Sequence, residues 1–185
     1  MTYKTALFSL ALLAGCGGTA DLYSVPTPAV SDSIRIGYAT VEVRDVSLPT
    51  YAADDVIAVQ GPGGVLLTDE NIRWADSPER AVGLELSRHL AQLSGRRVAS
   101  EPWPFEGFAD AILEVRFESL IAGADGIYRA SGQYFVSTER EVRDRSGLFD
   151  LAVPYVVDAG PAGIAAARGQ LVLDLAELIA TEGLR

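Results

Sequence analysis

Cysteine, histidine and lysine are almost absent from this chain of 185 residues, which has one of each. A single cysteine excludes an internal disulfide, so stability must come from the hydrophobic core. The single histidine, His89, cannot build a histidine cluster for a metal. The chain also lacks the Gly-x-Ser-x-Gly turn that would indicate a serine nucleophile for it. We therefore interpret His89 as a packing or surface residue, and we expect no catalytic site, metal or cofactor.

Long apolar runs and excess positive charge are also missing. The apolar stretch at residues 5–13 is far shorter than the ~20 residues of a membrane-spanning helix. The net charge of −10 argues against nucleic-acid binding. Three pairs of acidic residues could suggest a hydrolase or a metal site, but we interpret them as solvated residues of turns and loops. These pairs are Asp54-Asp55, Asp69-Glu70 and Glu139 with Glu141.

The N-terminus is typical of an exported lipoprotein. Lys4 precedes the short apolar stretch, a pattern of signal peptides. The segment that follows, Leu13-Ala14-Gly15-Cys16, resembles the lipobox recognised by bacterial lipoprotein-processing enzymes. This resemblance implies cleavage before Cys16, which then carries a diacylglycerol and an acyl chain. The alternative is an ordinary signal peptide with an incidental cysteine.

The rest of the chain divides into a tether and one domain. Residues 16–33 are rich in Gly, Thr, Ser, Pro and Ala, which predicts a flexible tether after a signal peptide of residues 1–15. We expect residues 34–185 to form a single domain. Gly61-Pro62-Gly63-Gly64 separates two short apolar runs and predicts a hairpin rather than a phosphate-binding loop. Apolar alternation predicts further strands at residues 34–43, 111–120, 127–137 and 148–157.

Two helices complete the expected fold. The first should begin at Ser77, with the serine hydroxyl as cap and Pro78 in the first turn, and end at Gly95. The second should run from about Pro161 to Ala180. The order of elements predicts an α+β fold, with a mainly antiparallel sheet and two helices packed on one face.

One segment is a candidate binding site. Trp103 lies between two prolines, and Phe105 and Phe108 follow. Aromatic residues in a proline-rich loop can bind a partner protein. They can equally belong to a loop that folds back over the core, and the sequence leaves both interpretations open.

Several short motifs follow the lipobox in a fixed order: Leu22-Tyr23, Leu48-Pro49-x-Tyr51 and Arg73-Trp74-Ala75-Asp76, and then a helix with spaced leucines. This order resembles the PqiC (YmbA) family of auxiliary lipoproteins of ABC-type transport. Asp76 departs from the glutamate usual in the family. By this resemblance Leu48, Pro49 and Tyr51 would close a strand, while Arg73 and Trp74 would anchor the first helix, in structural roles rather than in ligand contact.

The resemblance also implies a function. It suggests a periplasmic domain anchored in the outer membrane, which works with an MCE-domain protein and an inner-membrane transporter component to move lipids. Gly17 and Gly18 lack the aspartate that commonly retains lipoproteins at the inner membrane. The alternatives are a regulator of a periplasmic cell-wall enzyme and an enzyme with an unrecognised site. A homo-oligomer also stays open.

Overall fold

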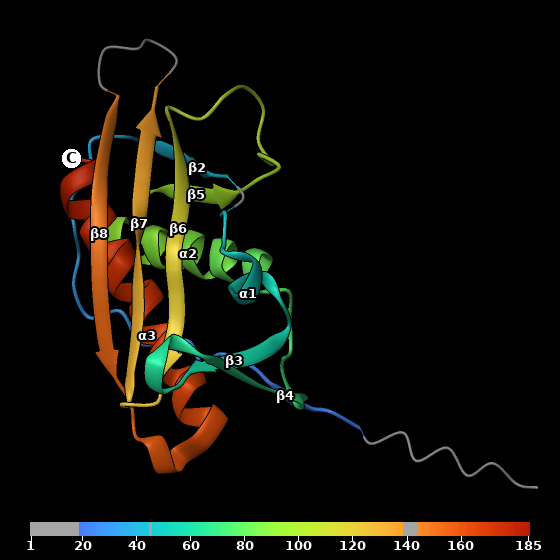
Figure 1. The fold of residues 1–185 in the computed structure, drawn as a ribbon. Helices are drawn as coiled ribbons and strands as arrows, with labels where there is room; N and C mark the ends of the chain where they lie inside the picture. The colour runs from blue at the N-terminus through green and yellow to red at the C-terminus, as the bar shows by residue number, and fades with distance from the viewer. Residues whose placement is uncertain (1–18, 45, 139–143) are drawn as a thin grey trace, which may run out of the picture.

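Three long antiparallel strands dominate the computed structural model, which describes residues 19–44, 46–138 and 144–185 (Figure 1). They are β6 (Ala111–Gly123), β7 (Ile127–Ser137) and β8 (Arg145–Pro154). Strand β7 pairs with β6 along one edge and with β8 along the other. The alternate residues Ala111, Leu113, Val115 and Phe117 are buried, as the sequence predicts.

Short strands complete the sheet along the other edge of β6. These are β1 (Asp21–Tyr23), β2 (Thr40–Val43), β3 (Val56–Gln60), β4 (Leu66–Trp74) and β5 (Arg97–Ser100). Strand β2 pairs with the beginning of β6 and β3 with its end, both in parallel. Strands β3 and β4 form the predicted antiparallel hairpin, whereas β1 pairs with β4, and β5 with β2, in parallel. The longest pairings are therefore antiparallel and the short ones mostly parallel.

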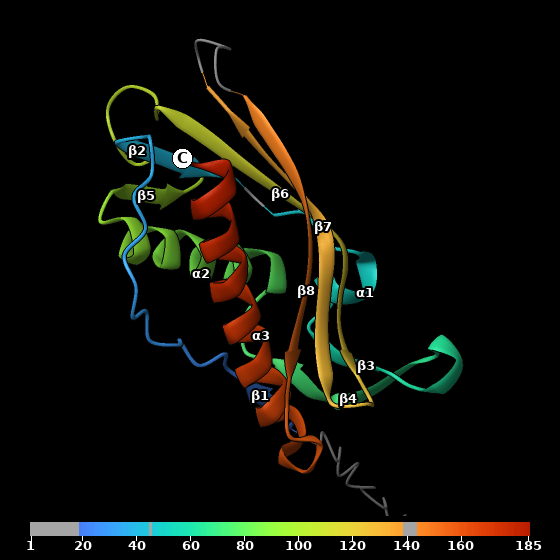
Figure 2. The same cartoon turned by 90° about the vertical axis from the view of Figure 1, so that its left-hand side faces the viewer.

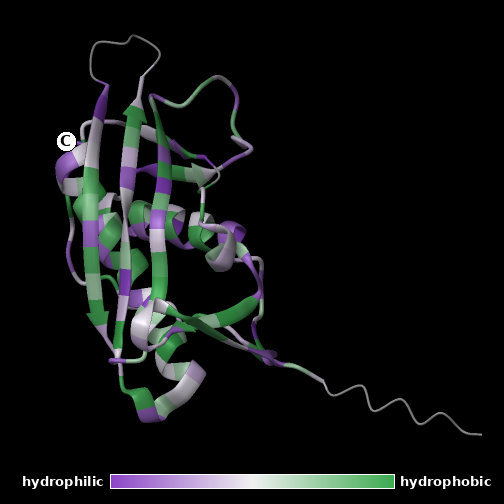
Figure 3. Ribbon diagram, in the orientation of Figure 1, coloured by the Kyte–Doolittle hydropathy of each residue, from purple (hydrophilic) through white to green (hydrophobic). Residues whose placement is uncertain are grey.

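Two helices, α2 (Pro78–Ser94) and α3 (Gly160–Leu178), lie on the same side of the long strands (Figure 2). Hydrophobic residues, green in Figure 3, recur along both helices, and α2 buries Val82, Leu86, Leu90 and Leu93. The predicted α+β fold is thus confirmed. The short helix α1 (Thr50–Ala53) was not predicted. Single helical turns lie at Pro62–Gly64, Val157–Ala159 and Ile179–Gly183. Among the described residues, no helix combines the length and the apolar character that crossing a membrane requires.

Helix α2 begins and ends where the sequence predicts, but one detail of its N-terminal cap differs. Gly95 has a φ of 63°, and its N–H donates to the carbonyl of Ala91, which ends the helix. Ser77 is the N-cap residue and Pro78 follows it, but the Ser77 hydroxyl makes no capping hydrogen bond. The predicted serine cap is therefore wrong; the N–H of Ser77 instead donates to the Asp76 carboxylate at 2.9 Å.

The predicted strand at residues 34–43 is shorter than expected. Only Thr40–Val43 pair as a strand. Before it, the N–H of Ile34 donates to the carbonyl of Leu93 at 2.8 Å, and that of Gly37 donates to Leu184 at 2.6 Å. Ile36 and Tyr38 are buried all the same. The apolar alternation thus reflects packing against the ends of two helical segments.

The predicted tether is also shorter than expected. Strand β1 pairs with β4 at Asp21–Tyr23, so these residues belong to the sheet. Beyond it, a Cβ added at Gly169 of α3 would lie 2.5 Å from the Pro26 carbonyl oxygen, which shows how closely residues 25–28 pack there. The tether prediction is wrong for this segment because its few apolar residues are enough to hold it on the domain. Residues 16–18 and residues 139–143 of the predicted charged connection lie outside the described residues.

Candidate functional site

The aromatic loop, residues 101–110, joins β5 to β6 at the same end of the molecule as the C-terminus (Figure 1). The rings of Trp103 and Phe105 meet edge to face with centroids 4.9 Å apart, and the Arg97 guanidinium lies 4.8 Å from the Phe105 centroid. Phe105 is 42% exposed and Phe108 is 83% exposed. Phe105 and Phe108 therefore face solvent, whereas Trp103 is partly buried and its Nε1 is buried without a hydrogen-bond partner.

Hydrogen bonds fix both ends of this loop. The Glu101 N–H donates to the carbonyl of Val43 at 2.8 Å. At the other end, the Asp110 carboxylate accepts from the N–H groups of Ala39 and Thr40 at 3.1 and 2.9 Å, while the Asp110 N–H donates to the Thr40 hydroxyl. A surface held in this way loses little conformational entropy when it binds a partner.

The second motif of the resemblance, Leu48-Pro49-x-Tyr51, begins the short helix α1. Leu48 is buried, and the Pro49 carbonyl accepts from the N–H groups of Ala52 and Ala53 in the turn of α1. The Tyr51 hydroxyl accepts from the N–H of Leu120 in β6 at 3.4 Å. The segment fills the gap between β2 and β3 along β6. Ser47 pairs with Arg116 of β6 directly before the motif, and the chain turns at Pro49, which has no N–H for pairing.

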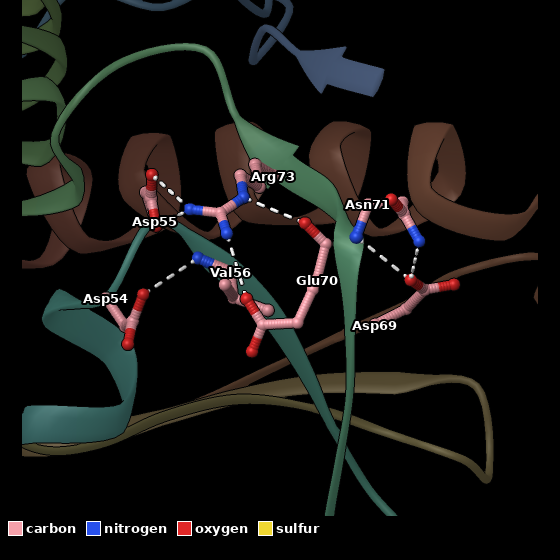
Figure 4. Close-up of polar contacts among 7 residues, drawn as sticks. All are labelled: Asp54, Asp55, Val56, Asp69, Glu70, Asn71 and Arg73. Carbon is pink, nitrogen blue, oxygen red and sulfur yellow. Dashed lines mark hydrogen bonds and ion pairs between the residues drawn. The ribbon is translucent and has the colours of Figure 1, made fainter. Parts of the chain in front are cut away.

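Arg73 connects the beginning of β3 to β4 (Figure 4). Its Nη1 lies 2.9 and 3.0 Å from the two carboxylate oxygens of Asp55, and its Nη2 lies 2.9 Å from Glu70 Oε2. These pairs raise the pKa of Arg73, chiefly through the hydrogen bond to Asp55. Because the groups are partly solvated, the pairs stabilise the fold only modestly.

Asp54 and Asp69, one residue from each of two acidic pairs, accept hydrogen bonds from the local backbone. Asp54 Oδ1 accepts from the Val56 N–H at 3.1 Å, and this bond lowers the pKa of Asp54. Asp69 Oδ1 accepts from both the backbone and the side-chain amide of Asn71 (Figure 4). Asp69 and Glu70 lie within β4 and not in the predicted turn. In the described part of the chain, no three acidic, cysteine or histidine side chains gather as metal ligands would.

Trp74, the other motif residue, is buried at the end of β4 against an arginine that the sequence analysis missed. The guanidinium of Arg168, in α3, lies 4.7 Å from the Trp74 ring centroid, and Arg168 is only 2% exposed. Its Nη2 lies 3.4 Å from Glu85 Oε1 in α2. Arg168 thus joins β4, α2 and α3. The one signal in the sequence is an arginine at an inward position of a helix made of small and apolar residues.

Burial around Arg168 shifts the pKa values of two neighbouring groups, Glu85 and Tyr128. Burial raises the pKa of Glu85, and the nearby Arg168 offsets only part of this effect. Burial raises the pKa of Tyr128, in β7, to about 12. Glu85 Oε2 and Arg168 Nε have no hydrogen-bond partner. A cavity of about 220 Å³ borders this pair and is also lined by Tyr23 and Arg88.

His89 lies in α2 and is buried, with Nδ1 lacking a hydrogen-bond partner. Burial lowers its pKa, so the imidazole is neutral at physiological pH. Of the two roles expected for His89, packing is the one that the structure shows.

Glu85→Gln should change how stability depends on pH. The pKa of Glu85 in the folded protein is above its ordinary value of 4.5, so the unfolded chain releases this proton first as pH rises. The protonated form of Glu85 therefore contributes stability that is fully present below pH 4.5 and is lost as pH rises through the folded pKa. Urea unfolding of both proteins across this range should show the parent losing stability relative to Glu85→Gln. A constant difference would contradict this.

A family comparison decides how this fold is classified. The sequence model of a family described as "ABC-type transport auxiliary lipoprotein component" matches residues 22–180. The chain belongs to this family. The match begins within β1 and ends beyond α3, and it includes the Leu48-Pro49-x-Tyr51 and Arg73-Trp74 motifs. The resemblance to the PqiC (YmbA) family is thereby confirmed.

Solved structures of relatives share the fold of this auxiliary lipoprotein. A crystal structure of an uncharacterised protein is 18% identical, covers 87% of this chain and 99% of that one, and has a TM-score of 0.66. A Xanthomonas campestris protein of the DUF330 family is 14% identical, covers 86% and 95%, and has a TM-score of 0.67. No curated protein matches the sequence. Membership makes the chain an auxiliary lipoprotein of ABC-type transport.

Proposed function

We propose that this lipoprotein is a noncatalytic docking subunit of a lipid-transport system. It is anchored through lipid at Cys16 in the outer membrane, faces the periplasm, and binds an MCE-domain protein that works with an inner-membrane transporter component. The system maintains the integrity of the envelope. The observation that carries the proposal is the exposed aromatic loop, fixed at both ends, with Phe108 83% exposed.

Several features of the chain agree with this assignment. The family is an auxiliary component of transport and not a transporter itself. Gly17 and Gly18 after the lipidated cysteine support outer-membrane residence. The loop lies at the end of the molecule opposite to β1, near which the described chain begins (Figure 2). A partner can therefore reach the loop while the protein stays on its membrane.

Replacing Trp103 or Phe108 with alanine should weaken capture of the partner by about 2 kcal/mol or more, which is roughly a 30-fold loss of affinity. Both variants should keep the melting temperature of the parent, since neither ring belongs to the core. Leu148→Ala, which removes an exposed leucine on β8, is the matched control and should bind as the parent does.

The test is a pull-down from solubilised envelope membranes with identification of the bound proteins, alongside thermal melts. An MCE-domain partner lost in the aromatic variants supports the proposal. A cell-wall synthase in its place would favour the alternative, a regulator of that enzyme. Capture of the chain's own copies would indicate a homo-oligomer. A large fall in melting temperature for Trp103→Ala would show that the ring serves stability.

A further inference from the structure

Exposed apolar side chains gather at the end of the molecule opposite to the aromatic loop. The hairpin of β3 and β4 contributes Val65, Leu66 and Leu67, which are 59%, 39% and 54% exposed. The connection from β8 to α3 contributes Val156 and Val157, which are 69% and 52% exposed. We name these five residues the apolar end. Solvent-exposed groups of this kind commonly mark a binding surface.

A groove joins the two parts of the apolar end. Its volume is about 390 Å³, and both Leu67 from the hairpin and Val157 from the connection line it. The side chains of Ile57, Ile72 and Ile164 form much of its wall. The apolar end is therefore a continuous surface, with one element on each side of a hydrophobic depression.

The register of β1 brings the start of the described chain close to this surface. Asp21 lies opposite Ile72, which lines the groove, and β1 runs parallel to β4. The chain before Asp21 therefore leaves β1 on the side from which β4 arrives, where the hairpin lies. Cys16 precedes Thr19, the first described residue, by three residues, so its Cα lies within roughly 11 Å of the Thr19 Cα. In Figures 1 and 2 alike, β1, the hairpin and the β8–α3 connection occupy the same end of the molecule.

We propose that the apolar end inserts into the interface of the bilayer that holds the Cys16 lipid, so that the domain rests on the membrane in one orientation. This proposal rests on the lipidation of Cys16 in the proposed function. The anchor keeps the bilayer at high effective concentration next to the apolar end, so even a weak intrinsic affinity suffices. The boundary between headgroups and acyl chains accepts a few apolar side chains from a structured element.

Charge indicates which lipid surface fits. Residues 61–68 of the hairpin contain no charged side chain, so its tip can enter the interface without burying a charge. Carboxylates border the apolar end: Asp69 lines the groove, and Asp158 follows Val157 directly. A zwitterionic surface therefore suits this end better than an anionic one, because anionic headgroups would repel these carboxylates.

The first test uses the lipidated full mature protein in phosphatidylcholine vesicles. Lipid blocks the only native thiol, so a cysteine introduced by Leu66→Cys or Val157→Cys is the single site for a fluorophore. Leu148→Cys, an exposed leucine on β8, is the control. Brominated acyl chains should quench the dye at positions 66 and 157 and leave the dye at position 148 unquenched. Absence of quenching at both 66 and 157 would overturn the proposal.

This experiment separates the proposal from the lipidation on which it rests. A parent protein that takes up the thiol dye would show a free Cys16, and so a failure of lipidation. A blocked Cys16 with no quenching at the apolar end would show that the anchor is present and the contact is not.

The second test uses the mature chain with Cys16→Ala, which has no lipid. Leu66→Ser with Leu67→Ser should reduce its partitioning onto phosphatidylcholine vesicles about tenfold or more, because two apolar side chains lose their burial. Phe105→Ser with Phe108→Ser, at the opposite end, should partition like the parent. Vesicles of equimolar phosphatidylcholine and phosphatidylglycerol should bind no better. Equal partitioning of the parent and the hairpin variant, or a parent that does not partition, would contradict the proposal.

Discussion

Cys16→Ala should transfer the protein from the membrane fraction to the soluble periplasmic fraction and abolish incorporation of a labelled fatty acid. The anchor proposed at Cys16 would make the largest single contribution to membrane residence, because each buried methylene adds about 0.8 kcal/mol and several acyl chains together hold almost irreversibly. The fold should be unaffected, since the described domain begins at Thr19 and the family match begins at residue 22. Any attachment through the apolar end alone should be lost on dilution and washing.

Gly18→Ala is the matched control for this experiment. It changes a residue close to the anchor, leaves the lipobox Leu13-Ala14-Gly15-Cys16 intact, and should keep both the label and membrane residence. Thermal melts of the two proteins in detergent should agree. Fatty-acid labelling of Cys16→Ala, or its retention on membranes after a salt wash, would contradict the assignment of the lipid to this residue.

Arg168→Ala should destabilise the domain by about 3 to 5 kcal/mol, the usual cost of removing one partner of a buried ion pair. Arg168 is 2% exposed and contacts both Glu85 and the Trp74 ring. Its removal takes the paired cation from the partly buried Glu85 carboxylate and opens a cavity between β4, α2 and α3. Urea unfolding at neutral pH should show the loss in the midpoint of the transition.

Arg168→Met is the informative control, because methionine restores most of the side-chain volume without the charge. It should recover the packing part of the loss, so that its free energy of unfolding lies between those of the parent and the alanine variant. In the double variant with Glu85→Gln, the remaining loss should shrink, since no charge is then left unpaired. An alanine variant within about 1 kcal/mol of the parent would contradict a structural role for this pair.

The long elements could be predicted because a local sequence pattern, apolar periodicity or a terminal signal, holds along each of them. Apolar residues alternate with polar ones through residues 111–117, which predicts a strand, and Pro78 and Gly95 predict the start and the end of α2. The structure has both elements at these positions. Residues 34–39 show the limit of this reasoning. Their alternation reflects hydrogen bonds to Leu93 and Leu184, which are distant in sequence, and no local pattern distinguishes that arrangement from a strand.

Short elements were missed for a related reason. Strand β5 has four residues and β1 has three, too few for a period to be measured. Both exist because a neighbouring strand offers unpaired backbone groups, which is a property of the assembled sheet. The expected tether failed at the same point, because β1 pairs with β4 and apolar residues of the segment, among them Val25 and Val30, pack against the core.

The candidate sites, too, could be predicted only in part from the sequence. The exposed aromatic loop could be located from Trp103, Phe105 and Phe108, although only the structure shows which rings face solvent. Arg73 and Trp74 were expected to have structural roles. Their partners, Asp55 and Arg168, come from other elements and could not be read from the motif. Long-range pairs of this kind are fixed by the topology.

The length of strand β6 also sets the distance between the aromatic loop and the β3–β4 hairpin. It starts where the aromatic loop ends and finishes at Gly123, which pairs with Gln60 of the hairpin. Thirteen residues in extended conformation span roughly 40 Å. On a domain that stands on its apolar end, β6 is a rigid spacer that holds the aromatic loop about this far above the headgroups. A partner protein must therefore extend to within this distance of the membrane to contact the loop. Shortening the β6–β7 hairpin would bring the loop, and with it the contact, closer to the membrane.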